Sequence, residues 1–281
     1  MSGFVAFCRS LGILLDETPP VGRWVRVPTE AHPRKKNGAV KFLGTHGFAQ
    51  EHSTMTDVAV WKADGDSSVP AIDQRALKEA EERERRRIAE GRAKAAERAA
   101  MILAQCRQDQ HAYLAAKGFP EAQGLVWERD GQRLLVVPMR VDGRLVGCQL
   151  IDEAGGKKFL PGQLTRNATF VIGRGEPLYC EGYATALSAH KALQFSRLPG
   201  SVVACFSAHN LVLMATSGIV LADNDASRTG ELAAQRTGRP YWMSPIVGED
   251  FNDYALRLGG FKASQALKLT LMQTRAKARA A

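Results

Sequence analysis

The sequence LYCEG at residues 178–182, followed by GIVLADND at residues 218–225, decides how the chain folds. Each is a short apolar run that ends in carboxylates, Glu181 in the first and Asp223 and Asp225 in the second. Such runs, bounded by glycine and turn residues, are typical of buried strands in a parallel sheet. A helical pattern, a third strand-like run and a second helical pattern lie between them, at residues 184–193, 202–206 and 211–215. This alternation predicts a doubly wound parallel α/β sheet whose carboxyl edge brings the three acids together.

Three carboxylates at one edge repel each other, and each raises the pKa of its neighbours unless a positive charge lies among them. A divalent cation supplies that charge, and an all-oxygen ligand set favours Mg²⁺ or Mn²⁺ over Zn²⁺. The stretch GEDFND at residues 248–253 adds a further acidic cluster downstream. A structural alternative is that Asp225 or Ser227 only caps the helical pattern that follows, because Asp and Ser are common helix-capping residues.

A Glu directly before a Gly, followed by Asp-x-Asp after a strand, resembles the Toprim domain of bacterial-type primases, topoisomerases and some nucleases. The resemblance covers residues 176–258. It implies nucleotidyl transfer, in which a 3′-hydroxyl attacks the α-phosphate of an incoming NTP and Mg²⁺ stabilises the attacking and leaving oxygens. Glu181 is then a metal ligand or the acid/base group. The remaining candidate ligands are Asp223, Asp225, Asp250 and Asp253.

The sequence EGYATA at residues 181–186 is similar to the corresponding motif in primases of plasmids, phages and integrated elements. Many cellular primases place an Asp four residues after the Glu of this motif, and here that position is Thr185. One carboxylate ligand of those relatives is therefore missing. The number of metal ions that the site would bind stays open.

The segment before this region has the pattern of an antiparallel sheet. Alternating runs at residues 133–139 and 144–151 flank an Asp-Gly pair, which is a strong hairpin signal, and a basic strand follows at residues 157–160. This order resembles the subdomain that precedes Toprim in the primase catalytic core. The resemblance implies that Arg140 and Lys158, with Lys157 beside it, hold the nucleotide or template. The alternative is that these are charged residues at strand ends that face water.

The first residues of the chain have short strand patterns around the basic turn RKKNG at residues 34–38. Arg34, Lys35 and Lys36 are candidate nucleic-acid-binding residues, because cations follow the phosphates of a single strand while bases stack on aromatic rings. For Trp24 and Trp61 we expect a place in the core of a small domain instead. The layout resembles the N-terminal module of plasmid and phage primase-like proteins, without the cysteine pairs of a zinc ribbon.

The patterns divide the chain into five parts. We expect a small N-terminal module at residues 1–69 and a charged helical linker at residues 70–117. A strand-rich basic subdomain at residues 118–172 and the Toprim-like domain at residues 173–260 form the proposed catalytic core. A basic helix at residues 261–281 ends the chain, and its sequence leaves open whether it docks on its own domain, on a partner or on DNA.

Composition narrows the class of protein. The 281 residues carry a formal net charge of +9, which favours a polyanionic partner. The five cysteines are scattered without a C-x-x-C pair, which indicates reduced, buried thiols. We find no leader pattern and no long apolar stretch, and therefore expect a cytoplasmic protein with no membrane partner. The chain also has no P-loop motif, so it does not unwind DNA by ATP hydrolysis.

Together these features predict a DNA primase-like enzyme that makes RNA primers for plasmid, phage or mobile-element replication. Its expected cofactor is Mg²⁺ or Mn²⁺, and its expected partners are single-stranded DNA and NTPs. A replicative helicase or another replication protein is a further candidate partner. Two alternatives remain: a Toprim nuclease that uses the same acids, and a non-catalytic single-stranded DNA-binding replication accessory.

Overall fold

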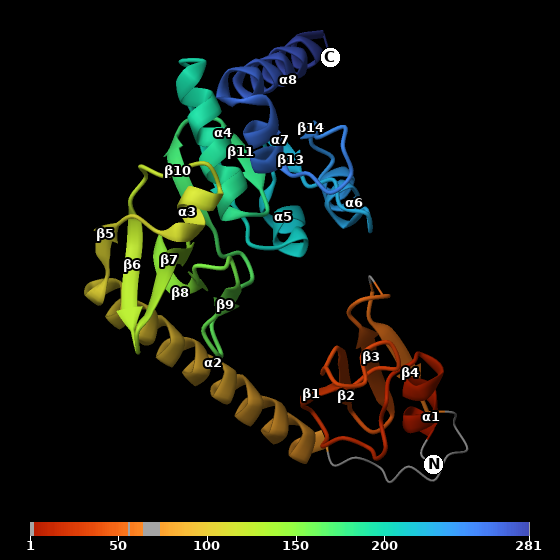
Figure 1. Ribbon diagram of the computed structural model, residues 1–281. Coiled ribbons are helices and arrows are strands. Elements are labelled where there is room, and N and C mark those ends of the chain that lie inside the picture. Colours follow the sequence, from red (N-terminus) through yellow and green to blue (C-terminus); the bar gives the residue numbers. More distant parts are fainter. Residues whose placement is uncertain (1–2, 56, 64–73, 281) are drawn as a thin grey trace. The chain divides into compact units, whose positions relative to one another are not determined.

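The computed structural model describes residues 3–55, 57–63 and 74–280. The chain divides into two compact units, Met1–Glu90 and Gly91–Ala281 (Figure 1). The candidate catalytic residues lie in the second unit, and the basic turn at residues 34–38 lies in the first.

The first unit is a four-stranded antiparallel sheet in the order β1-β2-β3-β4, with one helix packed on it. Its elements are α1 (Gly3–Ser10), β1 (Trp24–Val27), β2 (Gly38–Phe42), β3 (His46–Glu51) and β4 (Ala59–Lys62). The ring of Trp61 lies 5.6 Å from that of Phe4, which confirms its expected place in the core. The same expectation is wrong for Trp24, which is 45% exposed, because it alternates along β1 with Val25 and Val27, whose side chains take the core face.

Helix α2 (Gln74–Gln105) is the long charged helix that the sequence predicts. On its first half, Glu82 lies 3.6 Å from Arg86, one turn later, as the spacing of acids and bases indicates. Its second half differs from the charged linker that we expected, because it packs on the domain that follows. Ala99 and Ile102 are buried against Val136 and Cys148 of the following sheet, because small and apolar residues recur on one face of this part of the helix.

An antiparallel sheet in the order β5-β6-β7-β8-β9 follows α2. Its strands are β5 (Arg107–Asp109), β6 (Gly124–Arg129), β7 (Gln132–Val141), β8 (Arg144–Ile151) and β9 (Lys157–Phe159), with the short α3 (Ala112–Ala116) between the first two. The predicted hairpin is confirmed: β7 and β8 pair around Asp142 and Gly143, whose φ angles of 48° and 77° are both positive. Positive φ at both positions is what a type I′ turn requires.

The predicted α/β sheet is also present. Strands β12 (Gly200–Ala204), β11 (Pro177–Cys180), β13 (Ile219–Ala222) and β14 (Tyr241–Met243) are parallel neighbours, and β10 (Phe170–Arg174) is an antiparallel edge strand. The helices of this part are α4 (Tyr183–Phe195), α5 (Ala208–Met214), α6 (Thr229–Arg236), α7 (Phe251–Leu258) and α8 (Gly260–Ala280). Helices α4, α7 and α8 pack on one face of the sheet, and α5 and α6 pack on the other.

The basic C-terminal helix docks on its own domain. Figure 1 shows α8 alongside α4, and Leu267 and Leu271 are buried in the core that the two helices share. Arg275 adds an ion pair to Glu176 at 2.9 Å. The apolar face of α8 is therefore used within the domain, which is one of the three destinations that the sequence left open.

The cysteines are free thiols, and four of the five are buried. This agrees with the reduced state that their spacing predicts. Within the described residues, no helix is both long and apolar enough to cross a lipid bilayer.

Candidate functional site

The carboxyl ends of neighbouring parallel strands carry the acids that the sequence predicts. Glu181 follows β11 and Asp223 follows β13, and these strands pair in register through Cys180 and Leu221. We call Glu181, Asp223, Asp225 and Asp250 the acidic edge. The four carboxylates are close enough for each of the other three to raise the pKa of Asp223.

Asp223 is the most perturbed member of the acidic edge. Burial raises its pKa to about 7, and the charges of Asp250, Glu181 and Asp225 add to this, while Lys157 opposes it. Its Oδ1 atom is buried and has no hydrogen-bond partner. A buried carboxylate oxygen without a donor is unfavourable by itself, so the arrangement favours either a proton or a bound cation at this atom.

Glu181 is partly buried beside Asp223, where α4 begins. Burial raises the pKa of its carboxyl, the charge of Lys157 lowers it, and Asp225 raises it. Its backbone carbonyl accepts a hydrogen bond of 2.8 Å from Phe206, the residue that leads out of β12. The backbone of Glu181 is thus fixed by a neighbouring strand end, which leaves its carboxyl group as the part that can respond to a ligand.

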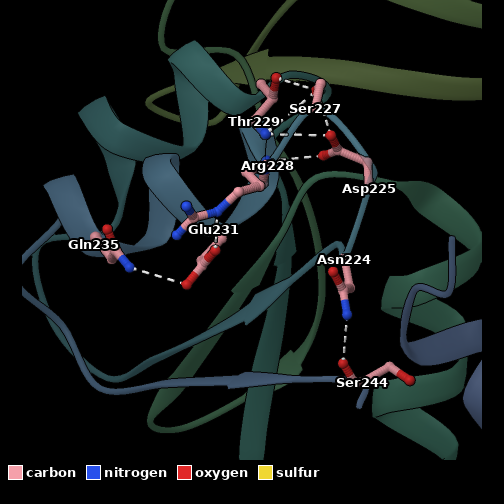
Figure 2. Close-up of polar contacts among 9 residues, drawn as sticks. Asn224, Asp225, Ser227, Arg228, Thr229, Glu231, Gln235 and Ser244 are labelled. Atoms are coloured by element: carbon pink, nitrogen blue, oxygen red, sulfur yellow. Dashed lines mark hydrogen bonds and ion pairs between the residues drawn. The ribbon is translucent and has the colours of Figure 1, made fainter. Parts of the chain in front are cut away.

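Asp225 accepts hydrogen bonds from the first turn of α6, as the alternative interpretation of this motif predicts, although the N-cap position itself is Arg228. Its Oδ2 accepts from the backbone N–H of Gly230 at 3.0 Å, and its Oδ1 accepts from that of Thr229 at 3.2 Å and from the Ser227 hydroxyl (Figure 2). Burial alone would raise the pKa of Asp225, but these hydrogen bonds outweigh it and lower the pKa. Asp225 is therefore ionised and held in place by the start of α6.

Asp250 begins α7 in the same way. Its Oδ1 accepts from the backbone N–H of Asp253 at 2.9 Å, and the Asp253 side chain accepts in return from the N–H of Asp250 at 3.3 Å. This reciprocal pair is a capping box. The other oxygen of Asp250 accepts from the buried hydroxyl of Thr185 at 2.9 Å, which ties α7 to the first turn of α4. Asp253 lies 3.5 Å from Lys117 and serves the helix cap.

A second network holds the two loops of the acidic edge together, and sequence reasoning did not find it. Asn224 donates to the carbonyl of Ser244 at 2.9 Å, as Figure 2 shows, and its N–H donates to the carbonyl of Glu249 at 3.1 Å. The Glu249 carboxylate accepts from Arg257 at 2.6 Å and from the Ser244 hydroxyl at 2.6 Å. Hydrogen bonds from Arg257, followed by that from Ser244, lower the pKa of Glu249 to about 2. In the sequence, only the acidic stretch GEDFND at residues 248–253 indicated this region.

The carboxylate oxygens of the acidic edge are donor atoms of the type that binds a divalent cation. Asp223 offers an unpartnered buried oxygen, and Glu181 lies beside it with a raised pKa. Asp225 and Asp250 already accept hydrogen bonds, although each carboxylate oxygen has a second lone pair. Among the described residues, no three His, Cys, Asp or Glu side chains stand in ready metal-ligating geometry. The oxygens match the ligand type that Mg²⁺ prefers, but they are not gathered in ligating geometry in this structure.

The predicted basic residues differ in how they face the acidic edge. Lys157 acts on the pKa of both Glu181 and Asp223, and its Nζ lies 5.9 Å from the centroid of the Tyr113 ring. Lys158, the next residue of β9, projects to the opposite face of the strand. Arg140 is exposed and donates to the carbonyl of Gly143 at 3.0 Å, across its own hairpin turn.

Tyr113 is a further residue of this region that the sequence did not indicate. Its side chain is buried, and its hydroxyl has no hydrogen-bond partner. Burial raises its pKa to about 12, with smaller contributions from Asp250, Tyr183 and Asp253. The ring is held in the core that α3 shares with α4, so it is a fixed neighbour of Lys157.

In the first unit, the predicted basic turn is exposed. Arg34, Lys35 and Lys36 lie in the connection between β1 and β2. Asn37, the next residue, donates to the buried carboxylate of Glu51 at 3.0 Å. Burial alone would raise the pKa of Glu51, but hydrogen bonds from Ser53, Thr54 and Asn37 lower it to about 2. The turn is thus anchored at one end while its three cations face solvent.

Comparison with known proteins adds only distant similarity to solved structures. No protein-family model matches the sequence, and no curated protein matches it. Among solved structures, the chain is similar to a primase domain of gp4 in the complex of the bacteriophage T7 lagging-strand DNA polymerase with two gp4 subunits, an RNA/DNA hybrid and dTTP. The similarity has 15% identity and a TM-score of 0.41, over 59% of this chain and 92% of that chain. A likeness this distant assigns neither fold nor function, and the α/β description above rests on strand order alone.

Proposed function

We propose that the protein is a primase-like nucleotidyltransferase that makes short RNA primers on single-stranded DNA. One observation carries the proposal: an unpartnered, buried carboxylate oxygen of Asp223 lies among three further acids at the carboxyl edge of a parallel sheet. Ligands bind at this edge in α/β sheets. The resemblance of the EGYATA and DND stretches to Toprim primases supports the choice of reaction.

Asp223 and Glu181 would hold Mg²⁺, with Asp225 and Asp250 as further oxygen donors. The ion would neutralise the charge that develops on the phosphate and on the attacking and leaving oxygens. Glu181 also has a raised pKa, which suits a carboxyl group that takes the proton of the attacking 3′-hydroxyl. Lys157, whose charge lowers the pKa of both Glu181 and Asp223, would pair with the triphosphate or the template.

Substrates and partners follow from the same proposal. The template is single-stranded DNA, the substrates are NTPs, and the exposed cations Arg34, Lys35 and Lys36 would contact the template backbone. Arg140 and Lys158 remain proposed contacts to nucleotide or template. A replicative helicase, or another protein of a plasmid, phage or mobile-element replisome, is the proposed protein partner.

The decisive experiment supplies the purified chain with single-stranded DNA, labelled NTPs and Mg²⁺, and analyses both nucleic acids by electrophoresis. Short labelled RNA that disappears in Asp223→Asn supports the proposal. Cut DNA without RNA would identify a nuclease, since the same acids can activate water. Binding of DNA with neither product would identify a non-catalytic replication accessory.

A further inference from the structure

A pocket of about 160 Å³ lies between α4, α7 and the start of α8, separate from the acidic edge. Successive turns of α4 lead to it: Thr185 contacts Asp250, Ser188 contacts Asn252, and Lys191 lines the pocket. An apolar cavity of about 150 Å³ can hold benzene, so a pocket of this size has room for one aromatic ring.

The polar floor of the pocket has an unused acceptor. Asn252 is 1% exposed, and its Nδ2 donates to the carbonyl of Lys117 at 2.9 Å and to the Ser188 hydroxyl at 2.8 Å. Its Oδ1 is buried and has no partner. Buried polar atoms are nearly always hydrogen-bonded, so this oxygen calls for a donor.

The charge of the pocket is positive. Lys191 is exposed and lies over the ring of Phe119 at 5.2 Å, and no ion pair of Lys191 occurs in the part of the chain that the structure describes. Lys117 has one acidic neighbour, Asp253 at 3.5 Å, and that carboxylate is also engaged in the cap of α7. Among the described residues, Lys117 thus has an ion pair with Asp253 and Lys191 has none, which leaves positive charge for an anion.

The walls of the pocket are apolar. Phe119, Ala192, Leu256 and Ala263 line it. Gly118 allows this arrangement, since its φ is +84° and a Cβ there would lie 2.5 Å from a methyl group of Leu256. A ligand would therefore find cations and an acceptor in one pocket with an apolar surface.

We propose that this pocket binds a small anion that carries a hydroxyl donor on an apolar or aromatic body. Lys117 and Lys191 meet the negative group, the hydroxyl donates to Oδ1 of Asn252, and the body packs on Phe119 and Leu256. The proposal does not rest on the primase function, because none of these side chains belongs to the acidic edge.

The test uses the whole chain without Mg²⁺ and two matched probes, phenyl phosphate and 4-hydroxyphenyl phosphate, in calorimetric titrations. We expect saturable binding of one equivalent, with the hydroxylated probe tighter. Lys191→Gln should weaken it about tenfold, which is the size of one charge-assisted contact. Lys268→Gln removes an exposed lysine from α8 outside this pocket and should change nothing. Leu256→Trp should block binding by filling the pocket.

Three results would overturn the proposal. The first is the absence of saturable binding at millimolar probe, which would mean that the pocket holds only water. The second is an equal effect of Lys191→Gln and Lys268→Gln, which would indicate unspecific charge attraction. The third is loss of binding in Asp223→Asn, which would show that the probe binds at the acidic edge. Equal affinity of the two probes would show that the hydroxyl group of the probe does not contact Asn252.

Discussion

At the scale of single residues, the Asp223 carboxyl that is proposed to bind a metal ion also destabilises the metal-free fold. This carboxyl is buried among like charges, so the folded state holds the proton more tightly than the unfolded state does. The folded pKa is about 7, against an ordinary value of 3.8. The native state therefore binds more protons between these values, and the metal-free protein loses stability as pH rises through this window.

We predict that Asp223→Asn raises the unfolding free energy of the metal-free protein more at pH 8 than at pH 4. The difference should be up to about 4 kcal/mol, because a shift of one pKa unit corresponds to about 1.4 kcal/mol. Urea unfolding of both proteins across this pH range measures the difference. Mg²⁺ should stabilise the wild type at pH 8 but not the variant. A difference that is independent of pH would contradict the raised pKa of Asp223.

The two lysines of β9 make a matched pair at the same scale. Lys157 acts on Glu181 and Asp223, whereas Lys158 is on the other face of the strand. Lys157→Ala should therefore lower priming at limiting NTP by about ten- to a hundredfold, the equivalent of losing a charged contact worth about 1.5–3 kcal/mol. Lys158→Ala is the control and should cost much less. If Lys158→Ala instead lowers priming more than Lys157→Ala, Lys158 is the residue that holds the nucleotide or template, as the family resemblance implies.

At the scale of elements, the start of α7 depends on a contact with α4. The Thr185 hydroxyl donates to the Asp250 carboxylate at 2.9 Å in a buried position. Thr185→Val keeps the shape and removes the donor, so we expect a loss of about 1.5–3 kcal/mol in unfolding free energy and weaker Mn²⁺ binding. Thr185→Ser should restore most of both. Wild-type values for the valine variant in urea unfolding and in Mn²⁺ titration would show that this hydrogen bond does not position Asp250.

At the scale of the whole molecule, the net charge of +9 and the exposed cations at residues 34–36 favour electrostatic binding of nucleic acid. The logarithm of the affinity for single-stranded DNA should fall linearly with the logarithm of salt concentration, by roughly 0.7 per phosphate contacted. Fluorescence anisotropy at several salt concentrations measures this slope. Replacing Arg34, Lys35 and Lys36 by Gln should reduce it, and a flat titration of the wild type would count against a nucleic-acid partner.

The sequence by itself determined the alternating strands and helices of residues 178–225 and the hairpin that precedes them. Apolar runs that end in acids at Glu181 and Asp223 predicted parallel strands with a shared acidic edge, and the Asp-Gly pair at residues 142–143 predicted the hairpin. These features depend on local physics, because strand burial and turn geometry are set by a few neighbouring residues.

Only the tertiary structure decided how individual side chains are used. It placed Asp225 on the N–H groups of α6, turned Lys157 rather than Lys158 toward the acids, and seated α8 on α4. It also joined Thr185 to Asp250, which are 65 residues apart in the chain. Each of these outcomes depends on contacts between segments distant in sequence and on which face of an element is covered, and a local pattern contains neither.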